Sequence, residues 1–394
     1  THVPPCTLRF LRSVRLALVP LATVSKSSLM FPVLACAWQA VCAQSLSAPP
    51  VFRGFGPEHG LPSSQIQALG QDPAGRLWIG TSNGLASYDG HAFKSYVARL
   101  ERPQSLATGS VEALLIDAAG RVWVATQGGH LARYRPASDD FERIRIDAPV
   151  PEEIWALAEH RGHLWLGTYG AGLIELGADG QVLARFGVEV GLPSANIIDL
   201  SVAGDGSLWI ASFERSLARF DPLTARATVI NPATTPFEPM GLGSVGNQIW
   251  VSTRDGRRCR IDSGGAAVCA PVPLLALPGR ARMLLASERG DFSGGIGELV
   301  RERGSTIEHL RYRPGSVGGI PNHTFWVGLV DRDQGLWMGT TGGGLLHLPR
   351  EADQFQVWQA DALREQGLLD GRVRGLARMP GGEVYVGSMN AGLF

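Results

Sequence analysis

The sequence predicts an all-β protein: a β-propeller, with seven four-stranded blades, followed by the truncated start of a second propeller. Three observations predict it. A tryptophan recurs about every 43 residues in blocks of the form Gly-x-x-Trp-apolar-(Gly/Ala)-(Thr/Ser), the 394 residues include 50 Gly and 25 Pro, and turn sequences divide each interval into four short apolar runs. Four-stranded units repeated at this period stack as propeller blades, because each sheet buries its faces against its neighbours.

The aromatic anchor of each unit defines the repeat. Successive tryptophans from Trp78 to Trp250 are 41 to 45 residues apart, and the 87-residue gap that follows is two periods, which Phe292 divides. Tyr385 stands 48 residues after Trp337 and opens a further copy. We expect these large rings to fill the gaps between twisted blades. The predicted structural anchors are Trp78, Trp123, Trp165, Trp209, Trp250, Phe292, Trp337 and Tyr385.

The first unit shows how one blade is built. Asp72-Pro73-Ala74-Gly75 has the residue preferences of a type I turn, and Asn83-Gly84 favours a tight hairpin. Apolar runs lie on either side of these turns. The sequence therefore predicts strands at 66–70, 77–81, 85–88 and 93–96.

The predicted domains follow from the ends of the repeat. Residues 51–55 resemble a fourth strand but precede the first full unit, so they can complete the last blade and close a seven-bladed ring over residues 46–350. Residues 355–358 repeat that role. We therefore expect 351–394 to be the first, incomplete blade of a second propeller; a single eight-bladed ring is the alternative.

Residues 1–43 have the pattern of a signal peptide or an N-terminal membrane segment. Four cations and no acidic residue accompany an apolar run at 29–43 that ends in Val-Cys-Ala. A membrane span needs about 20 apolar residues, and Pro32 and Gln39 interrupt this run. We expect the rest of the chain to be exported.

Two cysteines, Cys259 and Cys269, follow this segment. The turn sequence at 261–265 lies between strand-like runs and places them opposite each other in a hairpin. Directly opposed strand positions are about 4.5 to 5.5 Å apart at Cα, a distance that a disulfide spans. The sequence predicts a possible disulfide here, and two buried free thiols are the alternative.

Composition and motifs point away from nucleic acid, metal and catalysis. The 36 basic residues balance 36 acidic ones, and Lys26 and Lys94 are the lysines, so no basic tract exists to contact phosphates. Asp72 and Asp117 lie in repeated turns, unlike the paired carboxylates of a glycosidase. We therefore predict no nucleic-acid partner, no cofactor, no metal site and no catalytic residue in this segment.

The propeller mouth is the predicted ligand site. The first strands of the units surround a central channel, and the loops that enter them cluster at one rim. The residues at the start of these strands vary between units while the packing positions repeat. Indole rings can stack on a sugar-like or amphipathic ligand; the alternative is that they only fill the channel. The candidate ligand-binding residues are Gln65, Gln67, Glu112, Glu153, Trp155, Asn196, His323 and Trp326.

The first unit resembles the two-component regulator propeller repeat. The resemblance rests on Leu61-Pro62, on Gln71-Asp72, on Leu77-Trp78-Ile79-Gly80-Thr81 and on Asn83-Gly84-Leu85, and weaker copies extend it over residues 50–394. Two units depart from the pattern. The sixth lacks the Trp and Thr, and the fourth has Phe213 to Ser216 where glycines are usual.

The resemblance implies an extracytoplasmic sensory input region of a bacterial transmembrane receptor. In such receptors a β-sandwich and a membrane span precede a histidine kinase or diguanylate cyclase output, both of which would belong to a longer protein. The implied full-length protein is a homodimer, tethered to the membrane with this region in the periplasm, and its small ligand is unknown, with carbohydrate one candidate. The alternatives are a protein-interaction propeller without a small ligand and a secreted propeller lyase or glycosidase.

Overall fold

The computed structural model describes residues 50–99, 101–147, 151–214, 216–230, 238–245, 248–262, 265–271, 283–314, 318–354, 372–381, 384–390 and 392–393. The predicted signal segment 1–43 and the predicted strand at 355–358 lie outside these residues. Within the described part, no helix has the length and apolar character needed to cross a membrane.

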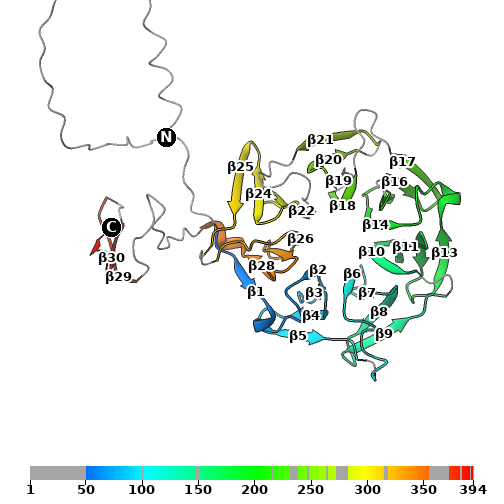
Figure 1. Cartoon of the computed structure of the whole chain (residues 1–394), viewed down its shortest axis with the longest axis horizontal. Helices are drawn as coiled ribbons and strands as arrows, with labels where there is room; N and C mark the ends of the chain where they lie inside the picture. Colours follow the sequence, from blue (N-terminus) through cyan, green and yellow to red (C-terminus); the bar gives the residue numbers. More distant parts are fainter. Residues whose placement is uncertain are drawn as a thin grey trace, which may run out of the picture. The chain divides into compact units, whose positions relative to one another are not determined.

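The described residues form seven four-stranded antiparallel sheets, called blades 1 to 7 below. The four strands of each blade follow one another along the chain in blades 1 to 6 (Figure 1). Blades 1 to 3 contain β2 (Ile66–Gln71), β3 (Leu77–Thr81), β4 (Gly84–Tyr88), β5 (Phe93–Tyr96), β6 (Val111–Ile116), β7 (Val122–Thr126), β8 (His130–Arg135), β9 (Asp140–Ile144), β10 (Glu153–His160), β11 (His163–Tyr169), β12 (Leu173–Leu176) and β13 (Val182–Phe186).

Blades 4 to 7 continue in the same order, and short 3-10 helices lie at Pro57–His59, Val188–Val190 and Arg350–Gln354. The strands are β14 (Ile197–Val202), β15 (Leu208–Ser212), β16 (Ser216–Asp221), β17 (Arg226–Ile230), β18 (Pro239–Val245), β19 (Gln248–Thr253), β20 (Arg257–Ile261), β21 (Ala267–Pro271), β22 (Met283–Leu285), β23 (Asp291–Gly294), β24 (Glu298–Arg303), β25 (Thr306–Arg311), β26 (Phe325–Val330), β27 (Leu336–Thr340) and β28 (Leu345–Leu348).

The blades are arranged as a ring. The inner strands β2, β6, β10, β14, β18, β22 and β26 each contact the next, and β26 contacts β2 (Figure 1). An N-terminal strand, β1 (Arg53–Phe55), supplies the outer strand of blade 7 by pairing with β28, so that Phe55 lies opposite Leu345. The prediction of an all-β propeller is confirmed, and pairing between the two ends of the repeat joins the ring.

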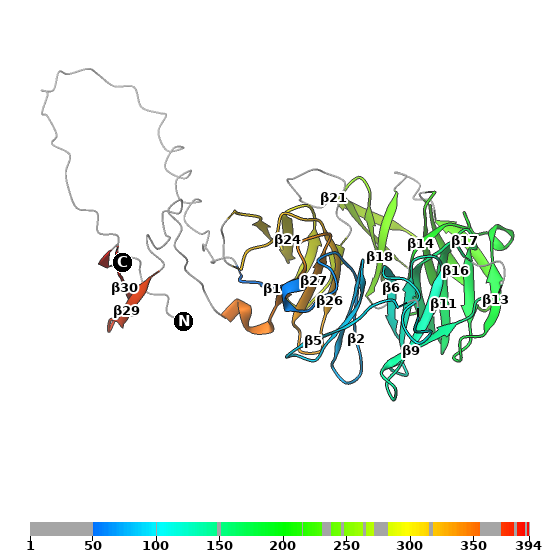
Figure 2. The same ribbon diagram turned by 60° about the horizontal axis from the view of Figure 1, so that its bottom comes forward.

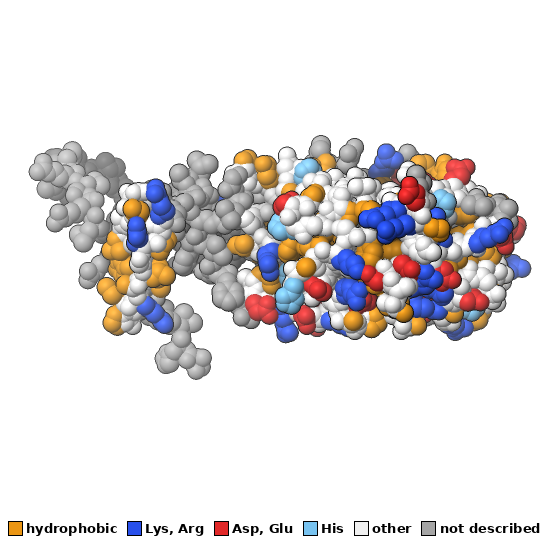
Figure 3. Space-filling view, turned by 90° about the horizontal axis from the view of Figure 1, so that it is seen from below, with side chains coloured by type: hydrophobic (Ala, Val, Ile, Leu, Met, Phe, Trp, Pro, Cys, Tyr) orange, Lys and Arg blue, Asp and Glu red, His pale blue; other side chains and the backbone are white. Residues whose placement is uncertain are grey.

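The strands of each blade run between the two faces of the ring (Figure 2). We call one face the mouth face: there the inner strands begin, and the turn between the second and third strands of each blade lies beside them. The opposite face carries the turns between the first and second strands and is called the Asp-turn face. On the side of the ring drawn in Figure 3, Lys and Arg side chains are interleaved with Asp and Glu.

Six of the eight predicted anchors lie in the hydrophobic clusters between blades. Trp78, Trp123, Trp165, Trp209 and Phe292 are each at most 1% exposed, Trp337 is 5% exposed, and Trp250 and Tyr385 are half-buried. Three of the rings contact aromatic side chains of the following blade. The ring centroids are 4.7 Å apart for Trp78 and Tyr134, 5.7 Å for Trp165 and Phe220, and 5.8 Å for Trp337 and Tyr88.

In three blades, an Asp turn fixes the orientation of the anchor ring of the same blade. The indole Nε1 of Trp78 donates to Asp72 Oδ2 at 2.9 Å, while the amides of Ala74 and Arg76 donate to the other oxygen. Blades 2 and 7 repeat the indole bond at 2.8 Å from Trp123 to Asp117 and from Trp337 to Asp331. The carboxylates therefore shape the turn and orient the ring at once.

The outer hairpin of blade 5 contains the two cysteines considered above. Cys259 on β20 lies directly opposite Cys269 on β21, and the structure joins them by a disulfide. Cys259 is fully buried in the core that Trp209 and Ile249 also enter.

A separate three-stranded sheet consists of β29 (Val373–Arg378), β30 (Val384–Ser388) and β31 (Gly392–Leu393). Tyr385 is on its middle strand, and the first pair of strands has a register shift between Val373 and Gly375 like that of the inner strands of the ring. That this sheet begins a second propeller stays a prediction.

Candidate functional site

A β-bulge opens the inner strand of six blades on the mouth face. The register of β2 and β3 shifts between Ile66 and Ala68, so Gln67 is left without an opposite residue. A bulge bends the strand and re-aims the extra side chain, which is why bulges often occur next to binding sites. The bulged residues are Gln67, Glu112, Trp155, Ile198, Met240 and Trp326, and all six are half-buried.

Backbone hydrogen bonds connect three of the mouth-face turns to the segment that enters the next blade. The amides of Gly172, Gly297 and Gly344 donate to the carbonyl oxygens of Ala195, His323 and Ser64, respectively. Gly172 has φ 69°, and a Cβ there would lie 2.3 Å from the carbonyl oxygen of Phe186, so this turn requires glycine. These contacts hold the mouth loops in place without using their side chains.

Three of the predicted ligand-binding side chains take part in this inter-blade bonding, and a fourth, Glu112, bonds within its own blade. Ser110 Oγ donates to Glu112 Oε1 at 2.7 Å and accepts from the side-chain amide N–H of Gln67 at 3.2 Å. Glu153 Oε2 accepts from the Gly128 amide at 3.0 Å. Asn196 Oδ1 accepts from the Gly170 amide at 3.0 Å, and its Nδ2 donates to Glu214 Oε1 at 2.7 Å.

Three aromatic rings from blades 3 and 4 gather beside these bonds. The Trp155 ring centroid is 5.1 Å from that of Tyr169 and 6.2 Å from that of Phe213. Tyr169 and Phe213 meet edge to face at 6.3 Å and 88°. Phe213 is 60% exposed although it follows the fully buried strand β15. We call Trp155, Tyr169 and Phe213 the aromatic patch.

Two carboxylates border the aromatic patch. Glu153 lies directly opposite Tyr169 in the register of β10 and β11, and Glu214 follows Phe213 in the chain. Burial raises the pKa of Glu153, and the nearby Glu112 charge adds to this, while the Gly128 amide opposes it. Burial would also raise the pKa of Glu214, but hydrogen bonds from Ser194 and Asn196 outweigh it and lower that pKa. Glu214 is therefore fully ionised at neutral pH.

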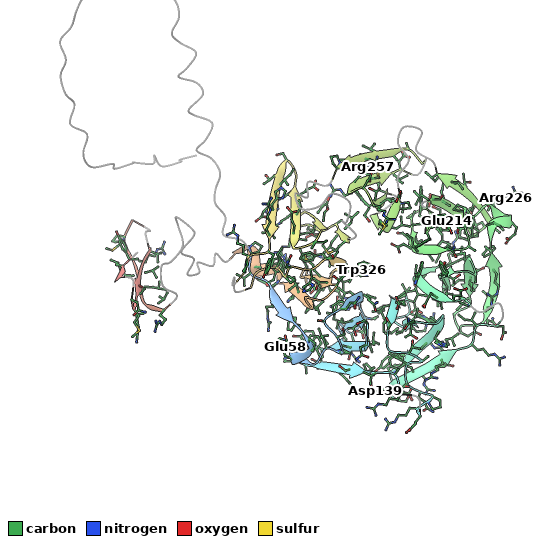
Figure 4. All side chains as sticks on the ribbon, in the orientation of Figure 1. Glu58, Asp139, Glu214, Arg226, Arg257 and Trp326 are labelled. Carbon is green, nitrogen blue, oxygen red and sulfur yellow. A yellow bond between two sulfur atoms is a disulfide. The ribbon has the colours of Figure 1, made fainter. Side chains whose placement is uncertain are left out.

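The remaining candidates belong to blades 7 and 1. Gln65 forms a β-bridge with Thr341, and His323 is exposed on the segment that enters blade 7. Trp326, the bulged residue of β26, and Glu214 lie on opposite sides of the space that the inner strands surround (Figure 4). The eight predicted residues thus lie along the mouth face of blades 7, 1, 2, 3 and 4.

Sequence reasoning missed Tyr169, Phe213 and Glu214. Tyr169 is the last residue of the second strand of its blade, and Phe213 and Glu214 directly follow the second strand of theirs. The repeat pattern places a threonine or serine and then glycines there, outside the column of inner-strand residues. The unusual segment from Phe213 to Ser216 was the available signal, because it replaces turn glycines with an exposed aromatic ring and a carboxylate. In the described part of the chain, no three or more His, Cys, Asp and Glu side chains are grouped to hold a metal ion.

The family model described as "Two component regulator propeller" matches residues 60–83. The chain thus carries this repeat where the first unit predicts it, and that resemblance is confirmed. A curated relative, histidine kinase P4 of Formosa agariphila, is 35% identical over 78 residues, which are 20% of this chain and 6% of that protein.

Solved structures share the fold of the ring. The extracellular domain assigned to the hybrid two component system BT3049 of B. thetaiotaomicron aligns with a TM-score of 0.72 at 19% identity, over 88% of this chain and 48% of its own length. Virginiamycin B lyase from Staphylococcus aureus aligns with a TM-score of 0.61 at 15% identity, over 76% of this chain and 98% of its own. The chain therefore spans about half the length of that extracellular domain and shares with both the propeller fold.

Proposed function

We propose that this chain is the extracytoplasmic sensory input region of a bacterial transmembrane receptor, and that it binds a small ligand at the mouth face. The observation that carries the proposal is the two component regulator propeller repeat at residues 60–83 within a ring that has the fold of a two-component extracellular domain. The short match to a histidine kinase supports the same class of signalling protein.

The mouth face supports the ligand-binding part of the proposal. Its bulged residues differ from blade to blade, whereas the anchors and Asp turns that hold the blades together repeat. Exposed Phe213 has no role in the inter-blade core, although most large apolar side chains of blades 3 and 4 are buried. A half-open aromatic surface with polar groups at its edge is typical of a binding site.

The proposal extends to parts of the receptor outside the described residues. We expect export through the segment 1–43, a periplasmic location with tethering to the membrane, a homodimeric full-length protein and a histidine kinase or diguanylate cyclase output. The disulfide supports export, since such bonds persist in oxidising compartments. Alkylation and intact-mass measurement of the exported protein before and after reduction tests this; two free thiols without reductant would contradict it.

The experiment that tests the sensory role uses the complete gene product in its own cells. Deleting residues 50–354 should leave the output domain folded and abolish its response to the medium component that triggers it. Trp155→Ala should weaken the response, with Leu223→Ala, an exposed residue in the turn between β16 and β17, as the matched control. A response that persists without the ring would overturn the proposal. A protein that is secreted whole and cleaves a substrate would favour the lyase or glycosidase alternative.

A further inference from the structure

The aromatic patch and its border carry an inference about the chemical class of the ligand, and it rests on the function proposed above. The patch is a contiguous surface contributed by two blades. Trp155 and Tyr169 come from β10 and β11, Phe213 follows β15, and Asn196 links the turns of both blades through Gly170 and Glu214. The Asn196 side chain therefore connects the Glu214 carboxylate to the turn that directly follows Tyr169.

The border of the patch presents two carboxylates whose nearby backbone donors are already engaged. The N–H groups of Gly128 and Gly170 are already donated to Glu153 and Asn196, and the Asn196 side-chain N–H is donated to Glu214. The carboxylate oxygens of Glu153 and Glu214 are the charged part of the remaining capacity, and the Tyr169 hydroxyl and the Trp155 indole N–H are neutral donors in the patch itself. A ligand group that matches such a border carries positive charge, whether or not it has N–H donors.

The charges near the patch point the same way. The charged groups that act on Glu153 are Glu112, Glu152 and His130. With Glu153 itself this makes three carboxylates against one histidine, so the local charge is negative. The aromatic faces add to the attraction, because the ring quadrupole binds a cation placed over it. Phe213, at 60% exposure, presents a ring to such a group beside ionised Glu214.

We propose that the aromatic patch, with Glu153 and Glu214 at its border, binds the ammonium group of an organic cation. The charged group lies over the exposed rings and next to the two carboxylates, and the rest of the ligand extends into the mouth. The same carboxylates repel an anionic ligand. A neutral ligand can only donate hydrogen bonds to them, without the attraction of opposite charges.

The test compares choline with 3,3-dimethylbutan-1-ol, which has the same shape without the charge. Each is titrated into the full chain, and binding is followed by tryptophan fluorescence and calorimetry. We expect choline to bind about tenfold more tightly than the neutral alcohol, and its affinity to fall with added salt. Equal affinities, or no saturable binding of choline, would overturn the inference.

Variants locate the cation. Phe213→Ala and Glu214→Gln should each weaken choline binding by about three- to tenfold, since each removes a cation–π or a charged contact. Leu223→Ala and Glu58→Gln are the matched controls, because Glu58 lies on the outer edge of the ring (Figure 4). Phe213 and Glu214 are both exposed, so folding should be preserved, and thermal unfolding of each variant checks this. Choline binding that is unchanged in both variants would place the cation elsewhere and overturn the inference.

The two proposals fail in different ways. A neutral oligosaccharide that binds in a Phe213-dependent manner, with no binding of choline, would overturn the cation and leave the sensory mouth standing. Choline binding at the patch, with a receptor output that does not need residues 50–354, would overturn the sensory role and leave the ligand class standing.

Discussion

On the Asp-turn face, blades 1, 2 and 7 repeat one hydrogen bond from an anchor indole to an aspartate. On the mouth face the same blades differ, because their bulged residues are Gln67, Glu112 and Trp326. Both positions belong to the same sheets and lie within a few residues of each other. The anchor ring must fit the next blade, and this restricts which residues can stand at that position. The bulged side chain is directed away from the ladder, so its identity is not constrained by strand pairing.

This difference separates stability from recognition. Substitutions on the Asp-turn face should lower the free energy of unfolding and leave a ligand affinity unchanged in the protein that remains folded. Substitutions on the mouth face should weaken ligand binding and leave the free energy of unfolding nearly unchanged. The predictions below test that separation, beginning with the largest expected effect.

Truncation of an anchor should cost far more stability than truncation of a mouth tryptophan. Trp123 is 1% exposed, and Trp123→Ala should lower the free energy of unfolding by about 3 to 5 kcal/mol, because it leaves a large cavity between blades. Half-buried Trp155 changed to Ala should cost only about 1 kcal/mol. Urea unfolding of both variants measures the difference; similar losses would mean that Trp155 is also a packing residue.

Removal of an Asp-turn carboxylate should have the next largest effect. Asp117 accepts hydrogen bonds from the Trp123 indole at 2.8 Å and from the Arg121 amide at 2.8 Å and is 5% exposed. Asp117→Ala should therefore cost about 3 kcal/mol, since it leaves a buried donor without a partner.

The matched control for Asp117 is Glu159, which stands six residues before Trp165 as Asp117 does before Trp123. Its carboxylate accepts from the Ala118 amide instead of the indole. Glu159→Ala should cost no more than about 1 kcal/mol. Equal costs for the two variants would show that the indole bond contributes little.

Blade 7 adds a titratable group to its Asp turn, which makes the ring closure sensitive to acid. The His347 ring stacks on Trp337 at 4.0 Å, and its Nε2 is 3.9 Å from Asp331. Burial lowers the pKa of His347 to about 4, against the opposing charge of Asp331; Arg53 and Arg289 lower it further, and Glu351 opposes them. Because the unfolded chain binds the proton near the ordinary pKa of 6.5, the folded state is favoured above pH 6.5 and loses stability as pH falls towards 4.

The loss over that window should be about 2 kcal/mol. It is measured as the free energy of unfolding at a series of pH values, and His347→Gln isolates it from the carboxylates that titrate in the same range. The variant should lose less stability than the native chain between pH 6.5 and 4. Parallel curves for the two proteins would show that His347 does not control the closure.

The repeat itself was predictable because packing positions must recur. The spacing of Trp78 and Trp123 gave the blade period, and the turn residues gave the first-unit strands to within a residue of β2 and β4. The pairing of Trp78 with Asp72 was not predicted, although both were singled out. A periodic pattern shows that two residues recur together, but it does not show that one donates to the other.

The mouth site was predicted less well for a physical reason. Strand alternation says which side of a sheet a residue faces, but a bulge breaks that alternation, so Gln67 and Trp155 were identified only as a variable column. Phe213 meets Trp155 and Tyr169 through the packing of two blades, which depends on the twist and separation of the blades. No local sequence pattern encodes that contact.

The smallest expected effect compares two anchor rings that differ in one hydrogen bond. Trp123 donates its indole N–H to Asp117, whereas Trp165 Nε1 is buried and has no partner among the described residues. Changing each to phenylalanine removes a similar amount of packing, but only Trp123→Phe also removes a hydrogen bond, the one to Asp117. Trp165→Phe removes an unsatisfied donor, which offsets part of its cost. Trp123→Phe should therefore lower the free energy of unfolding by about 1 kcal/mol more than Trp165→Phe in urea unfolding. Equal losses would mean that a buried water satisfies Trp165, and the Asp turn would then be one of two ways in which this fold holds an anchor indole.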